Sequence, residues 1–276
     1  GESLPDPPGV TSSSLSDCLL ELDLENSRDT NAMIRDLLGI WHPTIRLPKI
    51  DGPSIPFDGP QAAGYTLEAL LGVPTNSIPG PDHFGSELKT FRFGGRTTLM
   101  TPVADRGEEK RLGVRNFLKT HGHVGQDNHS LRFTGTYRAT QATKGRMLVA
   151  TGRLGHILTA RAVDLIDIQS RTNLAGWSVS HLGDSWLKKH DSAFYVQYER
   201  DRPRNRVRFL GYYRCRHTSP ERFLNAIDEG IVVYDPAHTL KAGQLKVRPQ
   251  WRISTSRKTL PDTLERLYAE SRWVEN

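Results

Sequence analysis

Cysteine is scarce in this 276-residue chain, and its scarcity excludes two classes of architecture. The two cysteines, Cys18 and Cys215, are far apart in the sequence and stand at no metal-ligand spacing. The sequence therefore predicts neither a disulfide scaffold nor a cysteine zinc site. We expect a reducing, cytoplasmic environment, in which thiols stay free. The chain is long enough to bury one large core or two small ones without cross-links.

Long apolar runs and internal repeats are also missing. No stretch approaches the eighteen or so apolar residues of a membrane span, and no basic segment followed by an apolar one opens the chain. We therefore expect no membrane partner. The chain begins with Gly1 rather than Met, so a further N-terminal domain outside this sequence is one interpretation of its start.

Net charge divides the chain into two unequal parts. Residues 1–60 hold ten acidic and four basic residues, a net charge of −6, whereas the remainder holds 33 basic and 21 acidic residues, a net charge of +12. A basic excess of this size attracts polyphosphate and predicts salt-dependent binding of nucleic acid. We predict that residues 1–45 are an acidic extension or linker, dispensable for activity, and that residues 46–276 form the functional domain.

Arginine is concentrated between residues 200 and 222. Five arginines occupy every second position from 200 to 208, a spacing that would place them on one face of a strand. The run from Asp201 to Asn205 also has the composition of a hairpin turn. A contact of Arg204 with a DNA phosphate and an ordinary solvated surface are both open interpretations.

The most informative stretch runs from Pro81 to Lys89. Apolar residues alternate after it, which predicts a strand over 87–93 whose Glu87 and Lys89 point to one face. Asp82 precedes them across a turn marked by proline and glycine. Two carboxylates can hold Mg²⁺, and a lysine can position a water or offset charge on a phosphate. The pattern therefore predicts a magnesium nuclease site.

A short amphipathic helix is predicted just before this motif. Apolar residues at 67, 70 and 71 follow the helical spacing, and Gly72 is suited to end the helix. Glu68 lies in its middle. It is either part of the site or a solvated helix acid.

These segments together resemble the MvaI/BcnI restriction endonucleases and the related MutH mismatch-repair nickase. The similarity rests on the run from Gly64 to Gly72, on Asn76-Ser77, and on the motif from Pro81 to Lys89. Further along, the runs N-A-I-D-E-G-I-V-V-Y-D (225–235) and Q-L-K-V-R-P-Q-W-R-I (244–253) are similar to that family's helix, buried strand and basic segment, in the same order. The resemblance covers about residues 49–268.

The resemblance implies both a fold and a set of site residues. The fold is α/β, a PD-(D/E)xK nuclease core with a mixed central sheet flanked by helices, plus a second lobe that recognises DNA. The catalytic lobe would span about 46–120 and the recognition lobe about 121–276, with interleaving left open. The implied catalytic set is Glu68, Asp82, Glu87 and Lys89, and the implied Mg²⁺ ligands are Asp82, Glu87 and the carbonyl of Leu88.

The implied partner is double-stranded DNA, bound by a protein monomer. The candidate DNA-binding residues are Arg92, Arg96, Lys119, His121, Arg204, Arg248, Gln250 and Arg252. The basic segment departs from the family pattern, an Arg-Gly pair followed by a histidine, because Pro249 and Gln250 stand there. The resemblance therefore does not predict which bases are read. A sequence-specific endonuclease, a nickase and a non-cutting DNA-binding module are the three functional interpretations.

Other segments give local predictions. His121, His123 and His129 could be zinc ligands, groove-facing residues or surface residues. We predict a helix over 29–38 closed by a glycine, an extended proline-rich strap over 43–60, and an antiparallel pair of strands over 193–198 and 206–215. A helix from 219 to 230, a strand over 231–234 and a final helix with a buried leucine and tyrosine stripe complete the pattern.

Overall fold

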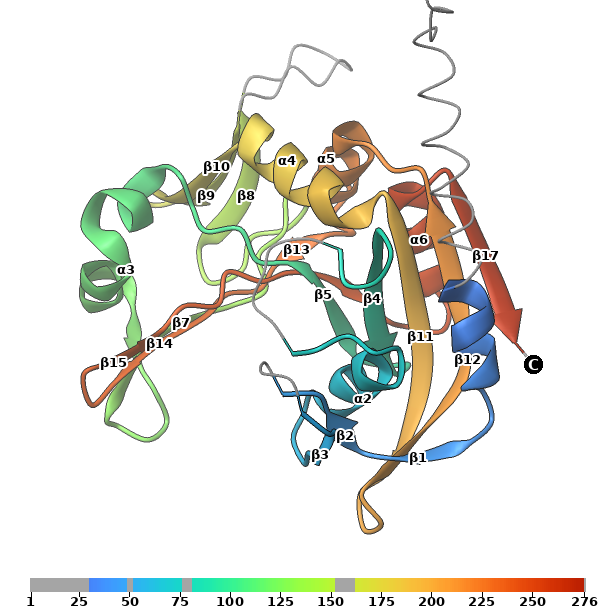
Figure 1. Ribbon diagram of the computed structural model, residues 1–276. Coiled ribbons are helices and arrows are strands. Elements are labelled where there is room, and N and C mark those ends of the chain that lie inside the picture. Colours follow the sequence, from blue (N-terminus) through green and yellow to red (C-terminus); the bar gives the residue numbers. More distant parts are fainter. Residues whose placement is uncertain (1–29, 49–51, 76–80, 152–161, 276) are drawn as a thin grey trace, which may run out of the picture.

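A mixed five-stranded sheet organises the larger part of the molecule (Figure 1). The computed structural model describes residues 30–48, 52–75, 81–151 and 162–275. In this main sheet β4 and β11 are parallel, β11 and β12 are antiparallel, and β1 and β17 pair with different ends of β12. The α/β class with a mixed sheet is therefore confirmed. The strands are β1 (Trp41–Pro43), β4 (Ser86–Phe91), β11 (Ser192–Asp201), β12 (Arg206–Arg216) and β17 (Glu270–Glu275).

Two hydrophobic cores lie on the two faces of the main sheet. On one face, Leu67 of α2 (Ala62–Leu70) packs with Leu88 and Phe194. On the other, Trp186 and Leu264 belong to the core that includes Tyr195 and Cys215. Three helices pack into this second core beside the main sheet: α4 (Val179–His190), α5 (Pro220–Asp228) and α6 (Leu260–Leu267). The two cores hold β4 and β11 rigidly between them, which fixes the positions of their side chains.

Local sequence signals set several element ends as predicted. The Ser219 hydroxyl accepts a hydrogen bond from the Arg222 N–H, Pro220 opens α5, and Gly230 takes the left-handed conformation after it (φ +71). Gly72 does the same after α2 (φ +75). The predicted antiparallel pair is β11 and β12, joined by a tight turn. The strand predicted over 231–234 is shorter, with only Val233–Tyr234 as β13.

A second group of elements forms the rest of the molecule. β13 pairs with β16 (Trp251–Ser254), which pairs with β5 (Arg96–Met100), and β8 (Arg146–Thr151), β9 (Ala162–Asp167) and β10 (Asn173–Ser178) form another antiparallel sheet. A four-stranded sheet and one long helix make a projection that we call the arm (Figure 1). The arm consists of α3 (Gly107–His121), β6 (His123–Val124), β7 (Ser130–Thr134), β14 (Ala237–Lys241) and β15 (Gln244–Lys246).

Two helices were not predicted from the sequence. α3 is interrupted at Gly113, whose φ of 70° and ψ of 148° are not helical, so the residues on either side do not share one continuous apolar stripe. α4 begins at Ser178, whose side chain accepts from the His181 N–H. Its buried residues Leu182 and Trp186 are only four positions apart in a polar stretch. None of the helices in the described residues is both long and apolar enough to cross a membrane.

The segment before residue 46 packs against the main sheet. Ile34 and Leu38 are 0% and 2% exposed in the same core as Leu67, and β1 pairs with β12. The Tyr212 hydroxyl donates to the Asn31 side-chain oxygen at 2.5 Å. Residues 30–45 of the predicted extension thus include side chains that the main sheet covers, and the division of the chain at residue 45 stays a prediction. Cys18 and the rest of residues 1–29 lie outside the described part of the chain.

The predicted lobes are interleaved along the chain. The main sheet takes strands from residues 41–43, 86–91, 192–216 and 270–275, whereas the arm is built from residues between 107 and 246. Within the predicted strap, β2 (Ile45–Arg46) pairs with β3 (Ile55–Pro56) beside α2. Neither lobe is thus a continuous stretch of sequence.

Candidate active site

Glu87 and Lys89 meet on one face of β4, as their spacing predicts. The Lys89 ammonium donates to Oε1 of Glu87, and the two side chains are 18% and 1% exposed. The parallel pairing places Glu87 opposite Ala193 and Lys89 opposite Tyr195. Their side chains therefore share the face of the sheet covered by α4.

A tight turn before β4 brings Asp82 to the same place. Asp82 Oδ2 accepts a hydrogen bond from the Leu88 N–H at 3.0 Å. The turn closes through a bond from the Ser86 N–H to the His83 carbonyl at 2.8 Å. Gly85 and the exposed Phe84 have positive φ values of 75° and 41°. A bulky residue with positive φ is uncommon, so the surrounding contacts hold this turn in place.

A second lysine, which the sequence did not indicate, reaches Glu87 from the other side. Lys189, in the last turn of α4, lies with its ammonium 3.6 Å from Glu87 Oε1. α4 leads directly into β11, which pairs with β4. The signal that could have indicated Lys189 is its place at the end of a helix that leads into the strand beside β4. That signal can be used only when both the helix and the strand pairing are known.

Glu68 comes to the site from α2. The pKa of its carboxyl is raised to about 7, mainly by burial and then by the nearby Asp82 carboxylate, whereas Lys89 and Lys189 act in the opposite direction. Gly64, one helical turn earlier, leaves room beside it, since an added Cβ would lie 4.0 Å from Glu68 Oε1. The structure therefore brings all four predicted catalytic residues together.

One buried carboxylate oxygen of the site lacks a hydrogen-bond partner among the described residues. Burial raises the pKa of Glu87, and Lys89 lowers it, while Oε2 of Glu87 is buried without a hydrogen-bond partner among the described residues. No group of three or more His, Cys, Asp or Glu side chains at metal-binding spacing is found in the described ranges. Mg²⁺ commonly binds through one or two carboxylates and keeps several waters. The Asp82 and Glu87 pair and the unsatisfied oxygen therefore fit such an ion.

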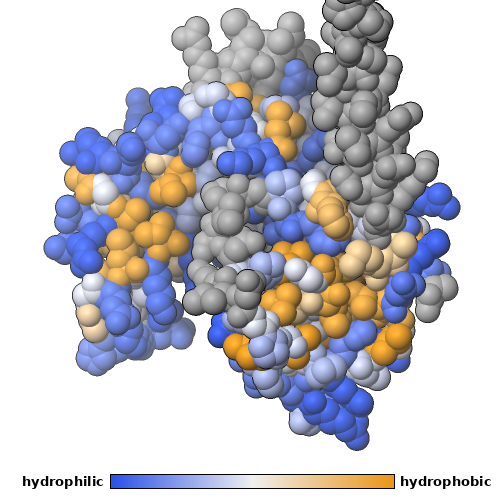
Figure 2. All heavy atoms as spheres, viewed as in Figure 1, coloured by the Kyte–Doolittle hydropathy of each residue, from blue (hydrophilic) through white to orange (hydrophobic). Residues whose placement is uncertain are grey.

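An open hollow of about 350 Å³ adjoins these side chains. Its lining includes Glu68, Lys89, Tyr198, Arg96 and Thr98, so it runs from the carboxylates to β5. In the space-filling view an open notch separates the lower part of the arm from the rest of the molecule, and the end of the arm is hydrophilic (Figure 2). A polar, elongated substrate would have access to Lys89 from this side.

Four of the predicted DNA-binding residues lie on β5, on β16 and on the segment before β16. Arg96 and Arg252 both donate to Asp235 Oδ2, at 2.9 and 3.0 Å. Gln250 donates to the Thr98 hydroxyl at 3.4 Å, and Arg248 is exposed beside it. Asp235 was not predicted, although it ends the buried run that the sequence singled out. The shared carboxylate holds the two guanidinium groups side by side.

The other predicted DNA-binding residues lie elsewhere. Arg92 stacks over the Tyr198 ring at 5.7 Å, and Lys119 and His121 end α3 in the arm. His121 lies 3.8 Å from Glu108, and no zinc cluster of His121 with the neighbouring histidines is found in the described residues.

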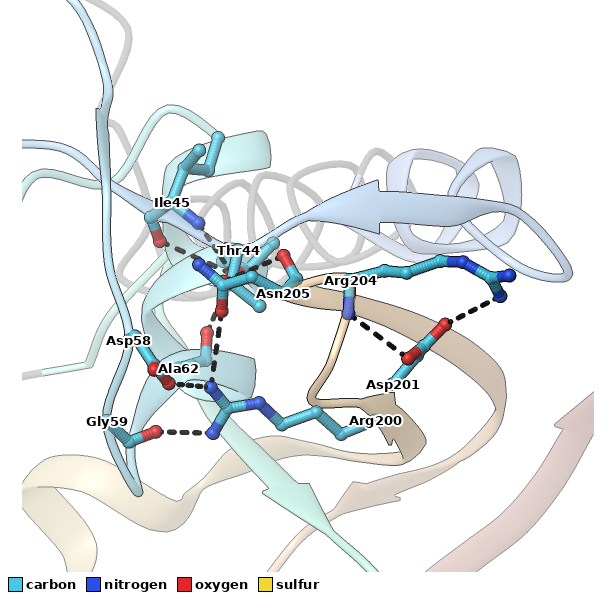
Figure 3. Close-up of polar contacts among 10 residues, drawn as sticks. Thr44, Ile45, Asp58, Gly59, Ala62, Arg200, Asp201, Arg204 and Asn205 are labelled. Carbon is cyan, nitrogen blue, oxygen red and sulfur yellow. Dashed lines mark hydrogen bonds and ion pairs between the residues drawn. The ribbon is translucent and has the colours of Figure 1, made fainter.

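Arg204 lies at the tip of the β11–β12 hairpin (Figure 3). Its guanidinium is 3.4 Å from Asp201, and the hairpin interpretation of this arginine-rich run is confirmed. The tip is tied to the N-terminal segment, since Thr44 donates to the Asn205 side chain at 2.6 Å and Arg200 donates to the Gly59 carbonyl at 2.7 Å. Arg204 is not among the residues that line the hollow beside Lys89.

Comparisons with a family model and with solved structures both give matches to this chain. A sequence model of the MvaI/BcnI restriction endonuclease family matches residues 31–260. A solved structure described as a complex of restriction endonuclease MvaI with its cognate DNA substrate aligns over 95% of this chain and 99% of that one, with 16% identity and a TM-score of 0.64. The structure of MvaI without DNA aligns over 91% and 98%, with 15% identity and a TM-score of 0.49. No curated protein sequence matches the chain.

Proposed function

The chain belongs to the MvaI/BcnI restriction endonuclease family, and from this premise we infer a Mg²⁺-dependent mechanism carried by the site on β4. As a member of that family it is a type II site-specific deoxyribonuclease. The observation that supports the mechanism most directly is the buried Glu87 carboxylate beside the Asp82 turn: two lysines contact its Oε1, and its Oε2 has no hydrogen-bond partner among the described residues.

Each side chain has a distinct part in the proposed reaction. Asp82, Glu87 and the carbonyl of Leu88 would hold the metal ion. When bound, Mg²⁺ supplies Lewis-acid polarisation of the phosphate and lowers the pKa of a water. Lys89 positions the attacking water and offsets the charge that develops on the phosphate. Lys189 contacts Glu87 from α4 and keeps its Oε1 side neutralised, which leaves Oε2 to face the ion.

DNA recognition is assigned to the strands next to the hollow. Arg96 and Arg252 lie beside each other on β5 and β16, and arginine pairs bidentately with guanine edges in the major groove. Arg248 and Gln250 stand just before Arg252 on the same segment. Arg92, Lys119, His121 and Arg204 are assigned to backbone phosphates, which position a duplex without reading its sequence. A monomer acting in the cytoplasm is the form we propose.

A plasmid assay tests the function and its metal requirement. With Mg²⁺ the protein is expected to convert supercoiled plasmid into discrete linear fragments with defined ends. With Ca²⁺ it is expected to bind DNA and cut at least about a hundredfold more slowly, because the larger, loosely coordinated ion serves the transition state poorly. The assay is a timed gel with Mg²⁺, Ca²⁺ or EDTA.

Each remaining outcome has a definite meaning. Nicked circles as the end product would favour a nickase, and unchanged plasmid with intact binding would favour a non-cutting module. Cutting at full rate in EDTA would contradict the metal mechanism.

Glu68 gives a pH prediction for the metal-free protein. Its carboxyl has a pKa of about 7 in the folded state against 4.5 as the ordinary value, so the folded state holds the proton more tightly. The neutral Glu68 carboxyl therefore stabilises the folded state at low pH. As the pH rises from about 4.5 to 7, the free energy of unfolding is expected to fall by about 1 to 3 kcal/mol. Urea unfolding in EDTA at pH 5 to 8 measures this change.

The matched variant is Glu68→Gln, which keeps the shape and removes the ionisation. The free energy of unfolding of the wild type should fall relative to that of Glu68→Gln as the pH rises from 5 to 8. Parallel curves for the two proteins would show that Glu68 does not ionise in this range.

A further inference from the structure

The sheet of the arm has two faces of opposite character. On one face Arg132, Lys241, Lys246 and Arg248 line an open hollow of about 470 Å³. The other face packs on α3 and buries Phe133 against Phe117, with ring centroids 4.7 Å apart. A histidine on this apolar face needs an explanation, because imidazole is seldom left among aromatic rings without polar partners.

His238, on β14, is fully buried on that face and is tied to Arg248. Its Nδ1 accepts a hydrogen bond from the backbone N–H of Arg248 at 2.9 Å. An accepting Nδ1 carries no proton, so the proton of the ring lies on Nε2. Nε2 lies 3.4 Å from the Tyr234 hydroxyl and 3.5 Å from Glu109 Oε2.

Glu109 completes the arrangement from α3. It lies in the first turn of the helix, its side chain is 1% exposed, and both carboxylate oxygens lack a hydrogen bond within the described residues. The neutral ring of His238 presents its Nε2–H to Glu109 Oε2 at 3.5 Å, so the contact is between a polar N–H and a carboxylate and not between two charges. A buried carboxylate is costly without such a partner. The pair therefore joins α3 to β14 at a fixed distance.

Arg248 is the residue that this arrangement fixes. It stands between β15 and β16, where no strand partner is available to its N–H, and His238 supplies the acceptor. Its carbonyl accepts from the Ala237 N–H at 2.9 Å. Its side chain is exposed, and no ion pair of its guanidinium with an acid is found in the described part of the chain. The backbone is thus held on both sides while the side chain stays free for a ligand.

We propose that His238, oriented by Glu109, is a positioning residue that sets Arg248 for its contact with DNA and thereby contributes to site discrimination. This inference rests on the proposed function, since it takes duplex DNA as the ligand of Arg248. An arginine whose backbone is immobilised loses less conformational freedom when its guanidinium binds DNA. Its contact with DNA is therefore stronger and more selective. Removing the acceptor at Nδ1 frees the segment without touching the guanidinium.

Two isosteric variants test the contact. His238→Asn places an amide oxygen near the position of Nδ1 and can still accept from the Arg248 N–H. His238→Gln places its amide near Nε2 and leaves that N–H unpaired. The preferred site is first mapped from the fragments that the wild type produces. Affinities for this site and for a scrambled duplex are then measured in Ca²⁺ at two salt concentrations, and thermal unfolding is recorded for every variant.

The expected result is a difference between the two variants that depends on Arg248. His238→Asn should keep the ratio of the two affinities within about threefold of wild type, and His238→Gln should lower it roughly tenfold. In an Arg248→Ala background the two variants should be indistinguishable, because the positioned side chain is gone. If His238 had a purely structural role, His238→Gln would still lower discrimination relative to His238→Asn in the Arg248→Ala background.

Three results would overturn the proposal. The first is an equal loss of discrimination between the preferred site and the scrambled duplex in His238→Asn and His238→Gln. The second is a loss of discrimination in His238→Asn as large as that in Arg248→Ala. The third is an unchanged affinity of Arg248→Ala for both duplexes. If His238→Gln does not fold, the comparison of His238→Asn with wild type and Arg248→Ala still decides. All of these differ from failure of the proposed function, which would appear as intact plasmid with the wild-type protein.

Discussion

Asp82→Ala and Lys89→Ala are each expected to lower the rate of DNA cleavage by at least roughly a hundredfold to a thousandfold. Asp82 is held by the Leu88 N–H and Lys89 by Glu87, so both groups are fixed where the scissile phosphate would lie. They serve the transition state more than the ground state, and affinity for duplex DNA should therefore change only a few-fold. Single-turnover cutting in Mg²⁺ and binding in Ca²⁺ separate the two effects.

Lys189 and its neighbour supply a matched control for this experiment. Lys189→Ala removes the contact with Glu87 and should lower the cleavage rate by roughly tenfold or more, whereas Lys188 is exposed on the same helix turn and Lys188→Ala should be neutral. Cleavage at the wild-type rate by Asp82→Ala or Lys89→Ala would contradict the assignment of the active site to β4. Equal losses for both α4 lysines would show a general effect of charge on DNA binding.

Removal of residues 1–45 is expected to unfold the main sheet, whereas removal of residues 1–16 should leave activity unchanged. The longer deletion takes away Ile34, Leu38 and β1. Each buried aliphatic side chain of this kind contributes about 2 to 5 kcal/mol relative to alanine, a large share of the stability of a typical domain. Circular dichroism and urea unfolding of the two truncated proteins measure the difference.

Point substitutions give the same answer without shortening the chain. Ile34→Ala and Leu38→Ala should each lower the free energy of unfolding by about 2 to 5 kcal/mol, and Met33→Ala, at a position 36% exposed, should change it by less than about 1 kcal/mol. A folded and active protein lacking residues 1–45 would show that this core is not required and that the segment is a dispensable extension.

The sequence predicted best what depends on neighbours along the chain. The cap at Ser219, the turn between β11 and β12 and the shared face of Glu87 and Lys89 follow from spacings of a few residues, and the structure confirms them. The glycine at position 72 ends α2 for the same kind of reason, because its positive φ suits few other residues.

Contacts between distant segments were beyond the reach of such signals. Lys189 reaches Glu87 only because β11 pairs in parallel with β4, and a parallel pairing leaves no trace in either strand alone. Ile34 and Leu38 lie in an acidic, proline-rich neighbourhood that resembles a linker by composition, but they pack on the sheet. The Glu109 and His238 pair joins residues more than a hundred positions apart.

The order in which the main sheet is assembled has a consequence for the cell that makes this protein. Glu87 and Lys89 of β4 leave the ribosome about a hundred residues before β11 and Lys189 are synthesised, and β17 follows later still. Among the described strands β4 pairs only with β11, so the motif is expected to stay unfolded on the growing chain until β11 has been made. A nascent enzyme is therefore expected to be harmless to nearby DNA until β11 and Lys189 have been synthesised.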